Sequence, residues 1–398
     1  MDLEKKKRLN ATMAQINKRF GAGTVMSASE AASSGKLTKK ILPTPSHELN
    51  AALHCGGFSG IVELYGPNSS GKTSLAIDTI VKNQKLDPDF AVAWLETEGS
   101  VTEEILRDHG VDLDRVFFWR QEDVGNAENA LDIARGFIAS GDIDLIVVNS
   151  VAGLTPKVEA EEDLEKQNIA LTARLLSKFF RVATGAASKG DVTLLFINQV
   201  RDNVGQMFGD TTTTTGGKAL AFYASQRIKM NRNKIMAGDP IKEEEGVKIS
   251  CITHKNRFAG RNNPFTKCIY YATYANGIDS VIPLPQLLAD AGIVRQKGAW
   301  WYYEDAQGNP YTVNGVVCKF GSKNAFLDAL RTNSVLYDEL VSKLNNNGND
   351  SGFVSTLSED EIAKIDEETA EINKLMDAVN RQEELDDINA VLNENSES

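Results

Sequence analysis

Short apolar runs alternate with segments of helical periodicity over the first half of the chain. The runs 61–65, 91–95, 116–119, 145–148 and 192–197 have the length and apolar composition of buried strands. The segments near 74–85, 102–109, 125–140 and 166–187 have the apolar spacing of helices. Because strands and helices alternate, the pattern predicts an α/β fold with a mostly parallel central sheet that is covered on both faces.

The pattern changes after residue 225. The segments 225–230, 247–254 and 267–274 have no long helices between them and are predicted to be antiparallel additions to the sheet edge. From about Gly277 a helix at 284–291, an aromatic run at 299–303 and helices at 323–332 and 335–345 indicate a small α+β domain. We therefore divide the chain into 1–40, 41–276, 277–345 and 346–398, the last being a polar linker and an acidic tail.

The N-terminal segment 3–20 has a narrow apolar stripe of Leu9, Met13, Ile16 and Phe20 among basic residues. This spacing predicts one amphipathic helix, which needs a surface on which to bury the stripe. The pattern alone does not distinguish a surface on the same chain from one on a neighbouring subunit. The Ser-, Ala- and Gly-rich stretch 27–40 is predicted to be a linker.

Composition places the chain among soluble globular proteins, with 41% hydrophobic and 25% charged residues in 398. No secretory signal and no apolar run of 18 residues is found, so we expect no membrane span. The four cysteines are scattered without a C-x-x-C pair, which argues against a zinc site or a disulfide framework and favours a reducing, cytoplasmic location.

The net charge of −12 is concentrated at the C-terminus. Residues 358–398 contain 14 Asp or Glu and 3 Lys or Arg, so the other 357 residues sum to about −1. We expect this tail to be mobile or weakly helical, because it has few apolar residues with which to build a core. The remainder of the chain is free to carry basic surfaces.

The stretch 66–73 fits the phosphate-loop pattern G-x-x-x-x-G-K-[ST] at every fixed position and lies between a predicted strand and a predicted helix. Backbone N–H groups and the helix dipole make such a turn a phosphate site. Lys72 is expected to reach the β- and γ-phosphates of a nucleotide, and the Thr73 hydroxyl to ligate Mg²⁺. The candidate nucleotide-binding residues here are Gly66, Pro67, Asn68, Ser69, Ser70, Gly71, Lys72, Thr73 and Ser74.

Polar residues follow three other predicted strands. Glu98 is placed to orient or deprotonate the water that attacks a γ-phosphate, although a solvated charge explains it equally well. Asn149 stands where phosphate-loop enzymes usually have an Asp that holds Mg²⁺ or its water shell, so an acceptor oxygen is kept without the charge. Gln199 precedes a polar stretch with few apolar residues, as expected of a nucleotide sensor joined to a binding loop or of an ordinary surface loop.

Two further features suit phosphate binding. The backbone N–H groups of Gly216 and Gly217 are candidates for phosphate contacts. Lys255 and Arg257 are two residues apart on one predicted strand and point the same way, so they either neutralise phosphate charge or form a solvated face.

Together these stretches resemble the RecA family of DNA strand-exchange recombinases, in one collinear order over about residues 5–345. Beyond the phosphate loop, the most specific matches are Asn149-Ser-Val-Ala-Gly-Leu-Thr-Pro156, Phe196-Ile-Asn-Gln-Val-Arg201, Met207-Phe-Gly209, Thr213-Thr-Thr-Gly-Gly217, Phe222-Tyr-Ala-Ser225 and Lys297-Gly-Ala-Trp300. The resemblance implies a RecA-type ATPase core, an N-terminal oligomerisation helix that docks on the next subunit, and the small C-terminal domain.

The resemblance also implies residue roles. Glu98 matches the water-activating glutamate, and Gln199 the γ-phosphate sensor that orders a second DNA-binding loop at about 200–217. The catalytic residues implied are therefore Glu98, Gln199 and Lys72. Lys255 and Arg257 match cations that reach the neighbouring subunit's ATP, and Tyr274 matches an aromatic near the adenine. The implied DNA-binding residues, some following a first loop at about 157–169, are Arg174, Ser177, Arg181, Arg201, Phe208, Gly216 and Gly217.

The function that the resemblance implies is an ATP- and Mg²⁺-dependent recombinase. It would form a head-to-tail filament on single-stranded DNA, pair it with double-stranded DNA, and act in recombination and repair in the cytoplasm, or in a host's cytoplasm if a phage encodes it. A DNA scaffold with weakened hydrolysis, motivated by Asn149, and a ring helicase of the same core are the alternatives.

The chain departs from the family pattern at several positions. Asn149 replaces the Asp, Arg261-Asn-Asn263 resembles an insertion, and the tail is longer than expected. The stretch 99–102 after Glu98 also differs, so adenine contacts are not carried over to those residues.

Overall fold

The computed structural model describes residues 2–161, 171–190, 192–202, 212–346 and 355–356. These residues divide into two units, 1–40 and 41–398. In the first unit, α1 (Leu3–Phe20) has no buried residue, as expected for an apolar stripe without a partner surface. The predicted linker is partly wrong, because 27–40 contains the helix α2 (Ala28–Ser33). Ser27 and Glu30 form a reciprocal capping box that begins α2.

The second unit is built on one large sheet in the order β10-β9-β8-β7-β1-β5-β4-β2-β3. Its parallel part consists of β1 (Ile61–Gly66), β2 (Val92–Glu96), β3 (Val116–Arg120), β4 (Leu145–Asn149), β5 (Thr193–Asp202) and β7 (Gln226–Asn233). The antiparallel part adds β8 (Gly246–Asn256), β9 (Thr266–Thr273) and β10 (Gly277–Ile278). Two short strands lie off this path, β6 (Thr212–Thr214) on β5 and β16 (Ser355–Thr356) on β9.

One strand direction differs from the prediction. The segment near 225–230 was expected to be antiparallel, but β7 is parallel to β1 and antiparallel only to β8. The expectation relied on the absence of long helices between this segment and the two that follow it, which says nothing of the connection that precedes it. The helix described in that connection is the short α10 (Ala219–Tyr223). A parallel crossover needs about a dozen residues of connecting chain, and it does not need a long helix.

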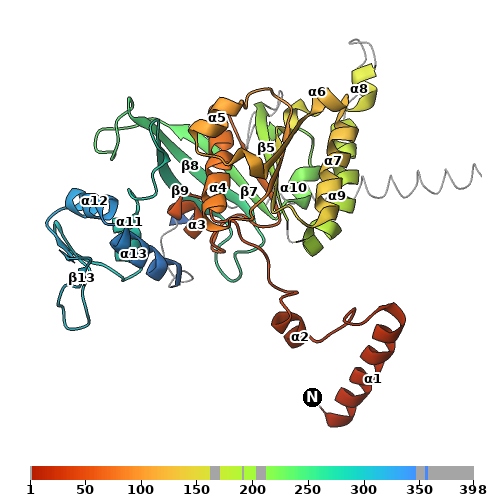
Figure 1. The fold of residues 1–398 in the computed structure, drawn as a ribbon, viewed down its shortest axis with the longest axis horizontal. Coiled ribbons are helices and arrows are strands. Elements are labelled where there is room, and N and C mark those ends of the chain that lie inside the picture. The colour runs from red at the N-terminus through yellow and green to blue at the C-terminus, as the bar shows by residue number, and fades with distance from the viewer. Residues whose placement is uncertain (1, 162–170, 191, 203–211, 347–354, 357–398) are drawn as a thin grey trace, which may run out of the picture. The chain divides into compact units, whose positions relative to one another are not determined.

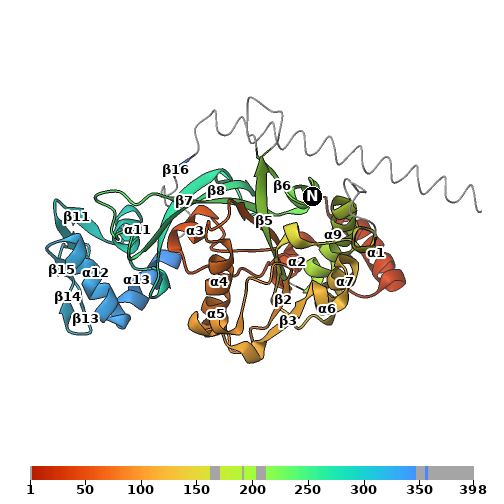
Figure 2. The same ribbon diagram turned by 90° about the horizontal axis from the view of Figure 1, so that it is seen from above.

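Helices cover both faces of the parallel strands, which confirms the predicted α/β fold. The helices α3 (His47–Ala52), α4 (Lys72–Leu86) and α5 (Glu103–Asp108) contribute to one hydrophobic core. The helices α7 (Ala127–Ser140), α9 (Leu171–Gly190) and α10 contribute to the other. Figures 1 and 2 show α7 and α9 side by side, with α4 and α5 across the sheet from them. Two short helices, α6 (Gln121–Val124) and α8 (Lys157–Glu161), lie in connections.

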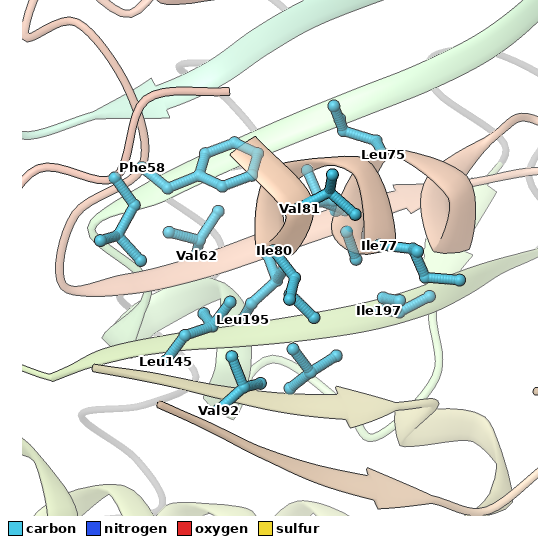
Figure 3. Packing of buried hydrophobic residues seen from close by; sticks show 14 of the residues in the cluster. Phe58, Val62, Leu75, Ile77, Ile80, Val81, Val92, Leu145, Leu195 and Ile197 are labelled. Carbon is cyan, nitrogen blue, oxygen red and sulfur yellow. The ribbon is translucent and has the colours of Figure 1, made fainter. Parts of the chain in front are cut away.

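The strands divide their residues between these cores with a period of two. Val92 and Trp94 of β2 face the α4 core, whereas Ala93 and Leu95 face the α7–α9 core. Figure 3 shows Ile77 and Ile80 of α4 packed with aliphatic side chains of several strands. This two-sided burial explains why the strands are continuous apolar runs in the sequence.

The C-terminal part of this unit has its own hydrophobic core, which includes Trp301, Phe320 and Phe326. Around it lie a small antiparallel sheet, a β-hairpin and three helices, in agreement with the predicted α+β composition. The elements are α11 (Leu284–Asp290), β11 (Arg295–Lys297), β12 (Trp300–Tyr302), β13 (Thr312–Val313), β14 (Val316–Val317), β15 (Lys319–Phe320), α12 (Lys323–Thr332) and α13 (Ser334–Asn346).

Within the described ranges, no helix combines the length and the apolar character that crossing a membrane requires. The acidic tail after residue 356 lies outside the described residues.

Candidate nucleotide-binding site

The phosphate loop joins β1 to α4, as its motif predicts. At Gly66 a Cβ atom would lie 2.1 Å from the Met230 carbonyl oxygen, so only glycine fits beside β7. Gly71 has φ of +85° and is the N-cap of α4, the residue at which the loop turns into the helix. Gly66 lets the loop lie close to β7, and Gly71 lets it turn into α4. The unpaired N–H groups at the start of α4 are therefore available to a phosphate group on the loop.

Lys72 is folded against the loop itself. Its ammonium group donates hydrogen bonds to the carbonyl oxygens of Gly66 (3.0 Å) and Pro67 (2.7 Å). Burial lowers the pKa of Lys72 to about 8, and the nearby Glu98 carboxylate acts in the opposite direction. The two carbonyl oxygens thus hold the charged Lys72 ammonium group at the loop. A phosphate group is a stronger hydrogen-bond acceptor and can take their place.

The candidate catalytic residues meet at the carboxyl end of the parallel strands. The amide of Gln199 donates to Glu98 Oε1 at 2.8 Å, and the Ser150 hydroxyl donates to the same oxygen. The register places Gln199 opposite Gly66 on the neighbouring strand β1. The sequence predicts Glu98 and Gln199 as separate candidates, and the fold brings them into direct contact. Ser150 was not proposed, although it follows Asn149 in a matched motif.

A second carboxylate, Glu96, lies fully buried at the end of β2. Its Oε2 accepts from the Trp94 indole N–H (3.0 Å) and from Asn149 Nδ2 (2.9 Å), and its Oε1 accepts from the backbone N–H groups of Glu98 and Ser100 (both 3.2 Å). Asn149 therefore acts as a donor to Glu96. In the sequence, the only signal for Glu96 as a buried acceptor was its position at a strand end beside Glu98.

The residues fit a magnesium ion that is held mainly through water. Asn149 Oδ1 is buried and has no hydrogen-bond partner within the described residues. This acceptor at the end of β4 suits a metal-bound water, which donates hydrogen bonds. Thr73, the second residue of α4, lies half-buried next to Lys72. No cluster of three or more His, Cys, Asp or Glu side chains that would bind a metal directly is found in the described ranges.

Lys255 and Arg257 lie at the opposite end of the strands from the phosphate loop. The register aligns Val62 with Gln226 and Gln226 with Asn256, so these cations lie near the start of β1 while the phosphate loop follows its end. Lys255 donates to the carbonyl oxygens of Ala221 (2.9 Å) and Phe222 (2.7 Å), and Arg257 donates to the latter at 3.3 Å. Burial and the neighbouring arginines lower the pKa of Lys255 to about 7. The fold therefore places these two cations away from the chain's own phosphate loop.

The candidate DNA-binding residues differ in accessibility. Arg174 and Arg181 are exposed on α9, whereas Ser177 between them is buried, and its hydroxyl has no hydrogen-bond partner within the described ranges. Gly216 and Gly217 have positive φ and pack against α9, where a Cβ on Gly217 would lie 2.7 Å from the Cβ of Ala173. The backbone of Arg201 continues β5, and Phe208 lies outside the described residues.

Tyr274, which the resemblance implies to lie near the adenine, lies near the phosphate loop. It is 65% exposed and lines a pocket of about 310 Å³ that also includes Ser69 and Ser74. An aromatic face beside a phosphate loop suits the base of a nucleotide.

A parallel sheet with helices on both faces, a phosphate loop after β1 and polar side chains at the neighbouring strand ends define an α/β phosphate-loop protein. The family model of the RecA N-terminal domain matches residues 7–279. Curated relatives, each called Protein RecA, include one from Bacteroides thetaiotaomicron (39% identical, covering 76% of this chain and 89% of the relative) and one from Acinetobacter baylyi (40% identical, covering 78% and 84%). The chain belongs to the RecA family.

Proposed function

We propose that this protein is a DNA-dependent ATPase that forms a head-to-tail filament on single-stranded DNA and catalyses homologous pairing and strand exchange. The observation that carries the proposal is the contact between Gln199 and Glu98. Gln199 lies on β5, whose end pairs with β6 across the segment proposed to bind DNA. One side chain therefore joins the residue proposed to activate water to the base of that segment.

In this mechanism each side chain has a separate task. Lys72 and the N–H groups at the start of α4 hold the phosphates, and Glu98 accepts a proton from the attacking water. Gln199 exchanges its hydrogen bond with Glu98 for one with the γ-phosphate, which couples the nucleotide to β5. Thr73 and, through water, Asn149 would hold Mg²⁺, which supplies positive charge to the phosphates when it is bound.

Lys255 and Arg257 lie at the end of the strands opposite to the chain's own phosphate loop. This position supports their action on the ATP of a neighbouring subunit. Such an interface is heterologous and generates a filament when it does not close. We assign the apolar stripe of α1 to the same contact, because none of its residues is buried. In this layout 1–40 serves assembly, 41–276 binds ATP and DNA, 277–345 is an accessory domain, and the protein works in the cytoplasm.

Two variants test the proposal, with ATP hydrolysis and electron microscopy on single-stranded DNA as measurements. Lys72→Ala should abolish hydrolysis and weaken nucleotide-dependent DNA binding, because the charge at the phosphates is lost. Glu98→Gln should stop hydrolysis but keep ATP binding and the filaments, because only the proton acceptor is removed. Closed rings in place of filaments, or hydrolysis at the wild-type rate in Lys72→Ala, would contradict the proposal.

A scaffold without efficient hydrolysis is the second candidate, and the loss of the charge at Asn149 is the observation that favours it. Filaments that form with ATP while the wild-type protein shows no DNA-stimulated hydrolysis at any Mg²⁺ concentration would support it.

A further inference from the structure

The pocket beside the phosphate loop extends from the loop towards β9 and β10. Ser69 and Ser74 lie at its loop end, and Tyr274 and Gly277 lie in its far wall. Among its lining residues, Asp78 and His109 form a carboxylate–imidazole pair. A nucleotide whose phosphates lie on the loop would extend its sugar and base into this pocket.

Asp78 holds the imidazole in one orientation. Its Oδ1 contacts His109 Nδ1 at 2.7 Å, and its Oδ2 accepts the backbone N–H of Ile278 at 3.2 Å. A Cβ on Gly277 would lie 2.8 Å from Asp78 Oδ2, so glycine leaves room for this carboxylate. Because a carboxylate only accepts, His109 Nδ1 carries the proton in this bond.

The other ring nitrogen, His109 Nε2, is left for a ligand. Within the ranges that the structure describes, no hydrogen-bond partner contacts it, and 27% of the side chain is exposed. The neutral imidazole therefore presents one oriented acceptor on a side chain that lines the pocket.

In the segment 99–102, which departs from the family pattern, the hydroxyl groups of Ser100 and Thr102 already form hydrogen bonds within the protein. The Thr102 hydroxyl caps α5 by accepting the N–H of Ile105 at 3.3 Å. The Ser100 hydroxyl lies 3.4 Å from both Glu96 Oε1 and Asn149 Nδ2. These side chains belong to the architecture of the strand ends, whereas His109 lines the pocket with one ring nitrogen uncommitted.

We propose that His109, oriented by Asp78, determines the specificity for the base of the bound nucleotide. The inference rests on the proposed ATP site. Neutral Nε2 accepts a hydrogen bond from an exocyclic amino group, as adenine has. A base with a carbonyl at the same position, such as hypoxanthine, places two acceptors against each other. Tyr274 contributes an aromatic face on which either base stacks.

ATP and inosine triphosphate test this, because their bases differ only at C6, where a carbonyl replaces the amino group, and at the adjacent N1, which is protonated in hypoxanthine. Binding is measured by calorimetry without DNA at about pH 8.5, because the hydrogen bond with Asp78 raises the pKa of His109. The wild-type protein should prefer ATP by about tenfold. His109→Leu should reduce the preference to within about twofold by weakening ATP binding.

A second variant and two controls complete the test. His109→Lys presents only donors, so it should favour inosine triphosphate, and it decides the matter if the leucine variant does not fold. Glu104→Gln changes an exposed charge on α5, the helix of which His109 is the C-cap, and should keep the wild-type ratio. Lys72→Ala should weaken both nucleotides equally, because their phosphates are identical.

The outcomes separate the two proposals. An unchanged ratio in His109→Leu and in His109→Lys, with both nucleotides bound, would overturn the role of His109 and leave the ATP site intact. Failure of the wild-type protein to bind either nucleotide would overturn the proposed function itself.

Discussion

Two buried carboxylates in the same sheet differ in what balances their charge. Glu63 on β1 and Glu96 on β2 are both fully buried, and each accepts an amide N–H from an asparagine at 2.9 Å, Asn198 in one case and Asn149 in the other. Glu63 also accepts from Arg227 Nε at 2.6 Å, whereas the described part of the chain contains no cation paired with Glu96.

The difference follows the positions of the two side chains. Glu63 lies within β1 at the level of Arg227 and Lys255, where its charge is neutralised inside the subunit. Glu96 lies at the carboxyl end of β2, where backbone and side-chain dipoles stabilise the charge without cancelling it. We infer that Glu63 serves the fold, whereas the uncancelled charge of Glu96 is available to the proposed Mg²⁺ site, to which Asn149 brings no charge.

The largest expected effect comes from breaking the neutralised pair. Arg227→Met leaves the Glu63 carboxylate buried without its cation, which should lower the free energy of unfolding by about 3–5 kcal/mol. Urea denaturation measures this. The double variant with Glu63→Gln should recover much of the loss, because no buried charge is then left alone. A loss below about 1 kcal/mol in Arg227→Met would show that Glu63 is not held by this pair.

The matched change at the other carboxylate should separate stability from activity. Glu96→Gln removes a charge that has no paired cation, but its amide N–H₂ group then faces two of the four donors from which the carboxylate accepts. The free energy of unfolding should therefore fall by about 1–3 kcal/mol, less than in Arg227→Met. Hydrolysis at limiting Mg²⁺ should fall by about tenfold, because the field of a full charge is lost. Equal hydrolysis at every Mg²⁺ concentration would remove Glu96 from the metal site.

The third substitution places a second charge beside Glu96. Asn149→Asp replaces the amide donor 2.9 Å from Glu96 Oε2 with a carboxylate. Without Mg²⁺ the variant should unfold about 1–3 kcal/mol more easily, because like charges are then adjacent. With Mg²⁺ the concentration for half-maximal hydrolysis should fall several-fold, since about 1 kcal/mol is a factor of about five. An unchanged Mg²⁺ requirement would make this departure from the family neutral.

The smallest effect should come from the partly exposed pair of Asp78 and His109. The hydrogen bond with Asp78 raises the pKa of His109, so the charged form is favoured in the folded state. The pair therefore stabilises the protein fully below the unfolded pKa of about 6.5, and this contribution disappears as the pH rises through the higher folded pKa. Asp78→Asn should cost about 0.5–1 kcal/mol more at pH 5.5 than at pH 9. A larger cost at pH 9 would reverse the assigned direction.

Two elements, α2 and β7, differ from their predictions for different physical reasons. The capping box of α2 is local, and Ser27 followed by Glu30 is visible in the sequence. The small residues around this capping box are typical of linkers, so composition and capping give opposite predictions for the same stretch. The direction of β7 is different in kind, because an apolar run predicts a strand without indicating whether its neighbour is parallel.

The sequence by itself determined the strands, the helices and the phosphate loop, because these depend on residues a few positions apart. Periodicity assigns a side chain to a face, and the fixed glycines determine where the loop turns. The tertiary structure decided which carboxylate is neutralised. Glu63 and Arg227 are 164 residues apart, and Asn149 and Glu96 are 53 apart. Such pairs depend on strand order and register, which are set by packing across the whole sheet and leave no local pattern in the chain.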